Sequence, residues 1–481
     1  MRRGVPSPFT IAVLLTLFTA IMVCIIRPEP PAPVPRYEII LGGVKKALSQ
    51  EEYEALAGKY HIPPAGQSHQ QQFSFPALLQ WWEQGFWELL EFAMQMVLIL
   101  VLGHALALTP AVSGFIHAIA RQCRGAAQAA AIVALASMAV ALINWGLGLI
   151  FGAILARKVA EKASATGIRV NYPLLGAAGY AGMMVWHGGF SGSAPLKVAE
   201  PNHFLVAQTG IIPIDLTLLS AMNITVNSVL LLLVPALLFI VGSNIRHRAE
   251  HPAGWLPPSA FPSQQPASVS EAASRLDSSR LLAYLFAALI LSAAVYKAFI
   301  SRGVSVFSFI NLNYINFLLL GIGILLHGNF SRYLRAIDEA VGGASGIIIQ
   351  FPLYAGIMGI MKYSGLIATF SDWLAQLAGS TTLPLFTFMS AAVVNLFVPS
   401  GGGQWAVQGP LVVQTALELG SSVPKNIMAL AYGDQLTNMI QPFWALPLLG
   451  ITGLDAKDIL PYSFLIMIAG GIVYSAALLI F

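Results

Sequence analysis

The run from Asn395 to Pro410 constrains this chain more than any other stretch. It reads Asn-Leu-Phe-Val-Pro-Ser-Gly-Gly-Gly-Gln-Trp-Ala-Val-Gln-Gly-Pro and lies between long apolar segments. Lipid offers no hydrogen-bond partners, so irregular backbone at membrane depth must be buried in protein or line a wet cavity. Three consecutive glycines and two prolines exclude an ordinary membrane helix here. The run therefore predicts a broken helix that presents backbone dipoles to a bound species.

The composition indicates a polytopic membrane protein. Hydrophobic residues make up 57% of the 481 positions and charged residues only 10%, whereas a soluble domain carries about 25% charged residues. Cys24 and Cys123 suggest neither a disulfide nor a metal site. We therefore expect the lipid bilayer as a partner, no nucleic acid, and no cofactor or metal other than Na⁺.

Nine apolar segments are suited to crossing a bilayer, for which about 20 residues are needed. Two further apolar regions, 127–157 and 383–418, are interrupted, the first by Asn144-Trp-Gly-Leu-Gly148 and the second by the opening run. The sequence thus predicts an all-α fold with nine spans and two re-entrant hairpins. The predicted spans are 8–27, 87–108, 172–195, 210–242, 280–300, 307–327, 343–363, 425–450 and 460–481.

Basic residues orient these segments, because cytoplasmic loops are enriched in Lys and Arg. Both flanks of 127–157 are basic, which favours a hairpin that enters from the cytoplasm. No Lys or Arg lies between Lys362 and Lys425, so 383–418 is expected to enter from the outside. Two arginines ahead of the first apolar run place the N-terminus in the cytoplasm.

The chain divides into two membrane halves. Residues 1–242 form an N-terminal repeat with an extracytoplasmic insert at 28–85, and residues 280–481 form a C-terminal repeat with a linking span. The Pro-, Ser- and Ala-rich stretch 243–279 is expected to be a cytoplasmic linker.

Landmarks recur between the halves at an offset of about 250 residues. Asn144 matches Asn395, and Tyr172-Pro173 matches Val423-Pro424, each pair 251 residues apart. Inverted repeats with paired interrupted segments are typical of secondary transporters, whose binding site lies near the bilayer midplane. The alternative is chance similarity between apolar, glycine-rich segments.

Both hairpin tips carry residues that we expect to bind a carboxylate. Glycine lets the backbone approach a ligand closely, and the helix that starts near Gln404 would point its free N–H groups toward the break. The alternative for such glycines is close helix packing. The predicted substrate-binding residues are Asn144, Gly146, Gly148, Asn395, Ser400, Gly401, Gly402, Gly403, Gln404 and Gln408.

Two other broken segments, 186–195 and 432–442, should face these tips and free carbonyls that can ligate Na⁺. Asp434 is the most deeply placed acid, and an intramembrane ionisable residue indicates a functional site. It is expected to bind a cation or carry a proton, with a structural hydrogen bond as the alternative. His187 is a second candidate proton carrier, but a lone histidine next to Trp186 is more often a satisfied structural residue. The predicted coupling-ion residues are Ser191, Ser193, Asp434, Thr437, Asn438 and Gln441.

The presumed site contains no cationic side chain, and Lys197 is the nearest. A di- or tricarboxylate would usually require such a cation, so amides and helix ends favour a small monocarboxylate. Its apolar tail would lie against aromatic side chains, for which the candidates are Trp145, Trp405, Phe443 and Trp444.

Six motifs, in this order, resemble the bacterial short-chain fatty acid transporter family, within the wider ion transporter superfamily. The resemblance runs from about Leu79 to the C-terminus and implies uptake of acids such as acetoacetate or butyrate across the inner membrane. It also implies a scaffold, a moving part with two hairpins, and often a homodimer. Position 434 carries Asp where the family pattern has Glu, which keeps the charge. The motifs are FWELLEFAMQM (86–96), NWGLG (144–148), GGFSGS (188–193), PSGGG (399–403), AYGD (431–434) and QPFWALP (441–447).

The sequence therefore predicts a secondary active transporter for small monocarboxylates, coupled to Na⁺ or H⁺, that works by alternating access. A passive channel for weak acids is the alternative, but a channel needs no pair of opposed hairpins. An enzyme would need a nucleophile–base pair or a metal set at depth, and Asp434 with His187 is too little for either.

Overall fold

The computed structural model describes residues 8–28, 38–41, 44–47, 74–88, 90–200, 203, 205–244, 276–299 and 312–481. These ranges are mainly helical, which confirms the predicted all-α membrane fold, with one addition. Strands β1 (Glu38–Leu41) and β2 (Val44–Ala47) pair antiparallel within the predicted insert. Most of that insert and most of the 243–279 linker lie outside the described residues.

Six helices in the described ranges are long and apolar enough to cross a membrane. Their outward side chains are apolar: Leu232 is 75% exposed and Ile472 is 66% exposed. Apolar surface of this extent is typical of contact with lipid. The count of nine spans and the inverted orientation of the halves stay predictions. The six are α1 (Pro8–Ile26), α3 with α4 (Phe75–Glu88, Leu90–Ala107), α6 (Ala126–Ile143), α11 (Ala221–Asn244), α12 (Arg280–Phe299) and α21 (Ala456–Ile480).

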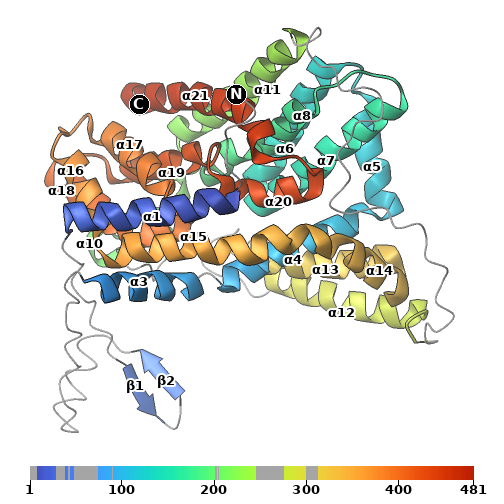
Figure 1. Cartoon of the computed structure of the whole chain (residues 1–481), viewed down its shortest axis with the longest axis horizontal. Helices are drawn as coiled ribbons and strands as arrows, with labels where there is room; N and C mark the ends of the chain where they lie inside the picture. The colour runs from blue at the N-terminus through green and yellow to red at the C-terminus, as the bar shows by residue number, and fades with distance from the viewer. Residues whose placement is uncertain are drawn as a thin grey trace.

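One part of the molecule consists of α1, α3, α4, α12 and the helices α13 (Leu312–His327), α14 (Phe330–Val341) and α15 (Ser345–Tyr363). Figure 1 shows α1, α15 and α3 lying side by side. Glycine explains the close approach of α3 to α15. A Cβ at Gly85 or Gly359 would overlap backbone atoms of the opposite helix, so small residues bring the two backbones together.

The other part contains both broken regions. Its first hairpin is α6 with α7 (Trp145–Ala165), and its second is α17 (Leu383–Asn395) with α18 (Gly401–Glu418). Both pack around two interrupted segments. The first comprises α8 (Tyr172–Tyr180), the short helices η1 (Ala181–Met184) and η2 (Trp186–Gly188), and α9 (Ser193–Lys197). The second comprises α19 (Val423–Thr437) and α20 (Pro442–Thr452).

Several boundaries differ from the sequence prediction. Helix α3 begins at Phe75, so the end of the predicted 28–85 insert packs against α15, and α11 begins at Ala221 rather than near position 210. Three helices were not predicted because they are too short for a span: α5 (Pro110–Arg121), α14 and α16 (Leu366–Ala375). The remaining short elements are α10 (Val206–Thr209), η3 (Ile214–Leu216) and η5 (Gly342–Ala344).

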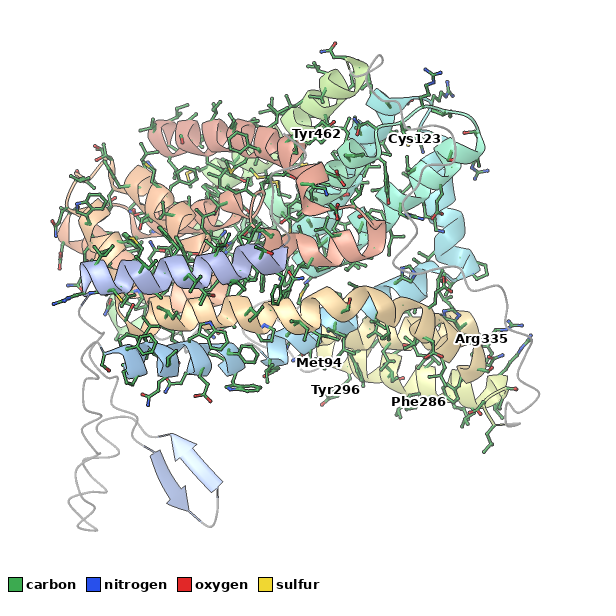
Figure 2. The ribbon with its side chains drawn as sticks, in the orientation of Figure 1. Met94, Cys123, Phe286, Tyr296, Arg335 and Tyr462 are labelled. Atoms are coloured by element: carbon green, nitrogen blue, oxygen red, sulfur yellow. The ribbon has the colours of Figure 1, made fainter. Side chains whose placement is uncertain are left out.

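The segment between α5 and α6 and the helix α14, which both carry basic residues, lie toward one end of the long axis (Figure 2). Figure 2 shows Arg335 of α14 and Cys123, which lies between α5 and α6, toward the same end. Arg121 and Arg124 flank Cys123 in sequence. A cytoplasmic location of this end would agree with the enrichment of Lys and Arg in cytoplasmic loops.

Candidate functional site

The first break closes against the interrupted segment that follows α8. Asn144 has an extended conformation between α6 and α7, and its side chain accepts a hydrogen bond from the Leu147 N–H at 3.0 Å. Asn is among the preferred helix N-caps, so the sequence itself positions this break. The Trp145 N–H donates to Ser191 Oγ at 2.9 Å, and the Phe190 N–H donates to the Leu142 carbonyl at 2.8 Å.

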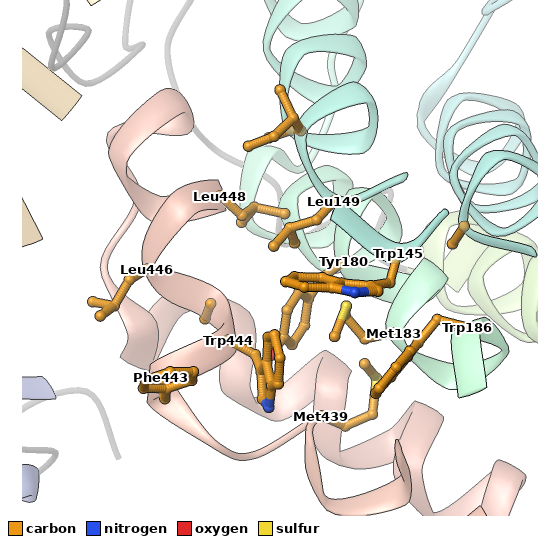
Figure 3. Packing of buried hydrophobic residues seen from close by; sticks show 14 of the residues in the cluster. Trp145, Leu149, Tyr180, Met183, Trp186, Met439, Phe443, Trp444, Leu446 and Leu448 are labelled. Atoms are coloured by element: carbon orange, nitrogen blue, oxygen red, sulfur yellow. The ribbon is translucent and has the colours of Figure 1, made fainter. Parts of the chain in front are cut away.

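Aromatic rings surround this first tip. The rings of Trp145 and Trp444 meet edge to face with centroids 4.8 Å apart, and Trp186 lies 6.0 Å from Trp145 (Figure 3). Such pairs stabilise packing beyond simple area burial. The predicted aromatic wall thus contains Trp145, Trp444 and Phe443, whereas Trp405 packs in a separate cluster.

The second tip lies against the same segment from the other hairpin. Ser400 caps α18 by accepting the Gly403 N–H at 3.1 Å. A Cβ at Gly401 would lie 3.0 Å from His187 Cε1 and 3.1 Å from Ser193 Oγ. A Cβ at Gly402, by contrast, would meet nothing within 4 Å. Ser191 therefore contacts one tip and Ser193 lies beside the other, so the predicted residue sets come together.

His187 and Asp434 form a buried pair that the sequence prediction did not make. His187 Nδ1 lies 2.8 Å from Asp434 Oδ2, and both side chains are at most 1% exposed. Gln435 Oε1 accepts the His187 backbone N–H at 2.9 Å. Asp434 Oδ1 has no hydrogen-bond partner among the residues that the structure describes. No sequence pattern signals this pair, because its members are 247 residues apart.

Backbone carbonyls fix the direction of the amides at the second break. Thr437 donates its hydroxyl to the Ala392 carbonyl at 2.9 Å, so its oxygen accepts from Asn395 Nδ2, also at 2.9 Å. Asn395 Nδ2 donates in addition to Asn438 Oδ1 at 2.8 Å. Asn438 must therefore turn its NH₂ group away. Asn438 Nδ2 is buried and has no partner in the described ranges.

Gln441, three residues after Asn438, has the same arrangement: its amide oxygen accepts a hydrogen bond and its NH₂ group is left without one. Its Oε1 accepts the Phe443 N–H at 2.7 Å, which caps the start of α20. Gln441 is 2% exposed, and its Nε2 likewise has no partner among the described residues. Since a backbone N–H can only donate, the Gln441 oxygen must face it and the NH₂ group is left over.

The glutamines of the second hairpin form a ladder along α17 and α18. Gln404 Nε2 donates to the Ala391 carbonyl and to Gln408 Oε1, each at 3.0 Å. Gln408 Nε2 then donates to Ser390 Oγ at 2.8 Å. Gln408 thus lies one turn farther from the tip, in the interface between the two helices.

Two asparagines of α11 hold the interrupted segment, and the sequence prediction missed them. Asn223 Nδ2 and Asn227 Nδ2 donate to the Gly188 carbonyl at 2.9 and 3.1 Å. Tyr432 donates its hydroxyl to Asn223 Oδ1 at 3.0 Å. Two amides four positions apart share one helix face, a pattern visible in the sequence. Tyr180, at the end of α8, links the two interrupted segments by donating its hydroxyl to the Asn438 carbonyl at 2.6 Å.

Two solved transporters align with nearly the whole chain at low identity. MtrF of Neisseria gonorrhoeae, described as illuminating a class of antimetabolite efflux pumps, is 14% identical with a TM-score of 0.42, covering 98% of this chain and 95% of its own. The YdaH transporter of Alcanivorax borkumensis is 16% identical with a TM-score of 0.43, covering 98% of each chain. These scores are too low to establish a common fold.

Sequence relatives are much closer. A candidate short-chain fatty acid transporter of Escherichia coli K12 is 37% identical over 410 residues, which is 84% of this chain and 90% of that protein. One from Haemophilus influenzae is 38% identical over 402 residues, 81% of this chain and 87% of that protein. The family described as short chain fatty acid transporter matches residues 1–481. The chain therefore belongs to the short-chain fatty acid transporter family.

Proposed function

We propose that the protein is a secondary active transporter that moves small monocarboxylates, such as butyrate or acetoacetate, across the bacterial inner membrane together with Na⁺ or H⁺. Family membership supports the substrate class. The meeting of two hairpin tips and two interrupted segments supports alternating access around one site. A homodimer and a cytoplasmic N-terminus stay predictions.

The unpartnered amide donors of Asn438 and Gln441 carry this proposal. A buried donor without an acceptor costs about 1–3 kcal/mol. A carboxylate that accepts from both would remove that cost, and hydrogen bonds to an ionised group are about twice as strong as neutral ones. Both residues, expected from the sequence to hold the coupling ion, are thus better suited to the substrate.

The charges around the break between α19 and α20 favour a substrate with one carboxylate rather than several. Lys197, the basic residue expected nearest to the site, pairs with Glu200 through its ammonium group. The first turn of α20, which begins at Pro442, directs the positive end of its helix dipole toward the same break. Trp145, Trp186 and Trp444 form an apolar wall for a short tail.

Asn438→Asp and Gln441→Glu test the donor pair. Each variant keeps the oxygen that its neighbour needs, from Asn395 or Phe443, and replaces the NH₂ donor by an acceptor. Butyrate affinity, measured by calorimetry on purified protein, is expected to fall roughly 10- to 100-fold, because one bond to a charged group is lost. The matched control is Gln122→Glu, at an exposed position between α5 and α6.

Uptake of labelled butyrate into proteoliposomes tests the transport mode. Accumulation above the outside concentration, driven by a Na⁺ or H⁺ gradient, is expected. Uptake that only equilibrates, whatever the gradient, would support a passive facilitator instead. Uptake equal to that of protein-free liposomes, together with wild-type butyrate affinity in both variants, would contradict the proposed function.

A further inference from the structure

A backbone N–H, which can only donate, fixes where the protons lie in the His187–Asp434 pair. The Ala194 N–H donates to His187 Nε2 at 3.3 Å, so this nitrogen holds a lone pair. The proton of the neutral ring must then sit on Nδ1, which donates to Asp434 Oδ2. Asp434 Oδ1 accepts nothing within the described ranges. A buried carboxylate with one bond from a neutral ring is costly, and a proton on Oδ1 would remove its charge.

Helix α19 itself also carries Lys425 and Tyr432, and among the described residues His187 is the ion-pair partner of Asp434. Lys197 on α9 pairs with Glu200, and Tyr474 on α21 donates its hydroxyl to the Met184 carbonyl. Helix α17 and η1 contribute no titratable side chain. Apart from His187, the elements packed against α19 carry these titratable residues: Lys197, Glu418, Lys457, Asp458, Tyr462 and Tyr474.

Four of the six side chains expected to bind Na⁺ have an oxygen that accepts from an N–H donor instead. Ser191 Oγ accepts from Trp145, Gln441 Oε1 accepts from Phe443, and Thr437 Oγ1 and Asn438 Oδ1 both accept from Asn395 Nδ2. Besides Asp434 Oδ1, the buried side-chain oxygens at the second hairpin without a partner among the described residues are Asn395 Oδ1 and Gln404 Oε1. Even with Ser193 Oγ, which lies beside the second tip, these side-chain oxygens are fewer than the six or so oxygens that a hard cation takes.

We infer that the coupling cation is a proton carried on Asp434 Oδ1, with His187 as the residue that positions the carboxylate. This inference rests on the proposed function and names the ion of the same site. The step is a plain protonation: Oδ1 takes up H⁺ while the site faces one side of the membrane and releases it on the other. No bond of the substrate changes.

Helix geometry links the proton to the substrate. Asn438, the helical cap that ends α19, follows Asp434 by four residues, so the Cβ atoms of the two lie on one helix face about 6 Å apart. At an effective dielectric of about 20, two negative charges at that distance weaken binding roughly 100-fold. The substrate carboxylate therefore binds once Asp434 is protonated. Gly401 at the second tip covers His187, so movement of that tip would change access to the pair.

Proton uptake on butyrate binding tests the inference directly. Calorimetry of the purified protein in buffers of different ionisation heat, from about pH 6 to about pH 9, counts the linked protons. For the wild type, butyrate binding should take up protons, and affinity should fall as pH rises. Asp434→Asn should take up no proton and bind butyrate with a flat pH profile. The exposed Asp215→Asn should behave as wild type.

His187→Gln separates a positioning role from a merely structural one. The amide can still donate to Asp434 Oδ2, so binding should persist while the proton-uptake profile moves along the pH axis. Wild-type binding that strengthens with Na⁺ over choline and takes up no proton would overturn the inference but leave the proposed function intact. That measurement needs no variant. Failure of every C2–C6 acid to bind would contradict both.

Discussion

The two hairpin tips carry the same kind of sequence and use it differently. In the first, a Cβ at Gly148 would lie 2.5 Å from the Ala141 Cα, so this glycine lets α6 and α7 touch. In the second, a Cβ at Gly402 would meet nothing within 4 Å. Gly148 is explained by packing, whereas Gly402 is exposed in the first turn of α18 with open space beside it. The comparison shows that the role of the glycines in such a break depends on the residues that face them.

The tips also differ in chemistry. Trp145 sets the first among aromatic rings, and its backbone N–H is tied to Ser191. The second is built on amides, with Gln404 beneath the tip and Asn395 at the end of α17. This division matches a substrate with an apolar tail and one carboxylate, the ligand proposed above.

The same substitution placed in each tip gives the largest predicted contrast. Gly148→Leu would force apart the α6–α7 contact, and overpacking of this kind costs about 1–3 kcal/mol or more, so the melting temperature should fall and yield should drop. Gly402→Leu should leave the melting temperature nearly unchanged while butyrate uptake falls at least about tenfold, a loss of about 1.4 kcal/mol. Equal destabilisation by both variants would break the comparison.

Removal of the side-chain cap at each tip tests the same comparison of the two tips with a smaller expected effect. Asn144→Ala and Ser400→Ala each delete one side-chain cap, which costs about 0.5–2 kcal/mol. Asn144 is buried and Ser400 half-buried, so the first variant should lower the melting temperature more. Asn144→Ser and Ser400→Asn retain a capping oxygen and serve as controls. A larger loss of stability in Ser400→Ala would reverse the order proposed for the tips.

The smallest effect concerns the end of α7. Burial raises the pKa of Glu161, but hydrogen bonds from Lys158 and Arg157 outweigh it and lower the pKa below its ordinary value. Since the folded pKa is depressed, the carboxylate stabilises the protein above the unfolded value of about 4.3 and loses this effect as pH falls through the folded pKa.

Glu161→Gln should therefore lower the melting temperature slightly at pH 7 and not in acid. The side chain is 37% exposed, so solvent screening limits the effect to less than about 1 kcal/mol. The measurement is the difference in melting temperature between variant and wild type across pH. A difference that persists below about pH 4 would show that packing, not charge, is responsible.

Local chemistry made part of this structure predictable. Asn144 and Ser400 are strong N-cap residues beside glycines, so both breaks could be located from the sequence. The pairing of His187 with Asp434 could not, because it joins residues from different halves. The free amide of Asn438 also depends on a distant carbonyl, that of Ala392. Helices α5, α14 and α16 lack the long apolar runs by which the other segments were recognised.

The order of synthesis separates the partners of this site in time. Ser191 can bond the first tip as soon as its own half emerges, because Trp145 precedes it. His187 must wait for Asp434, which is 247 residues farther along the chain. At about 5–20 residues per second, the ribosome needs roughly 12–50 s to supply that carboxylate. The newborn first half therefore holds His187 without its carboxylate partner until the second half has been made.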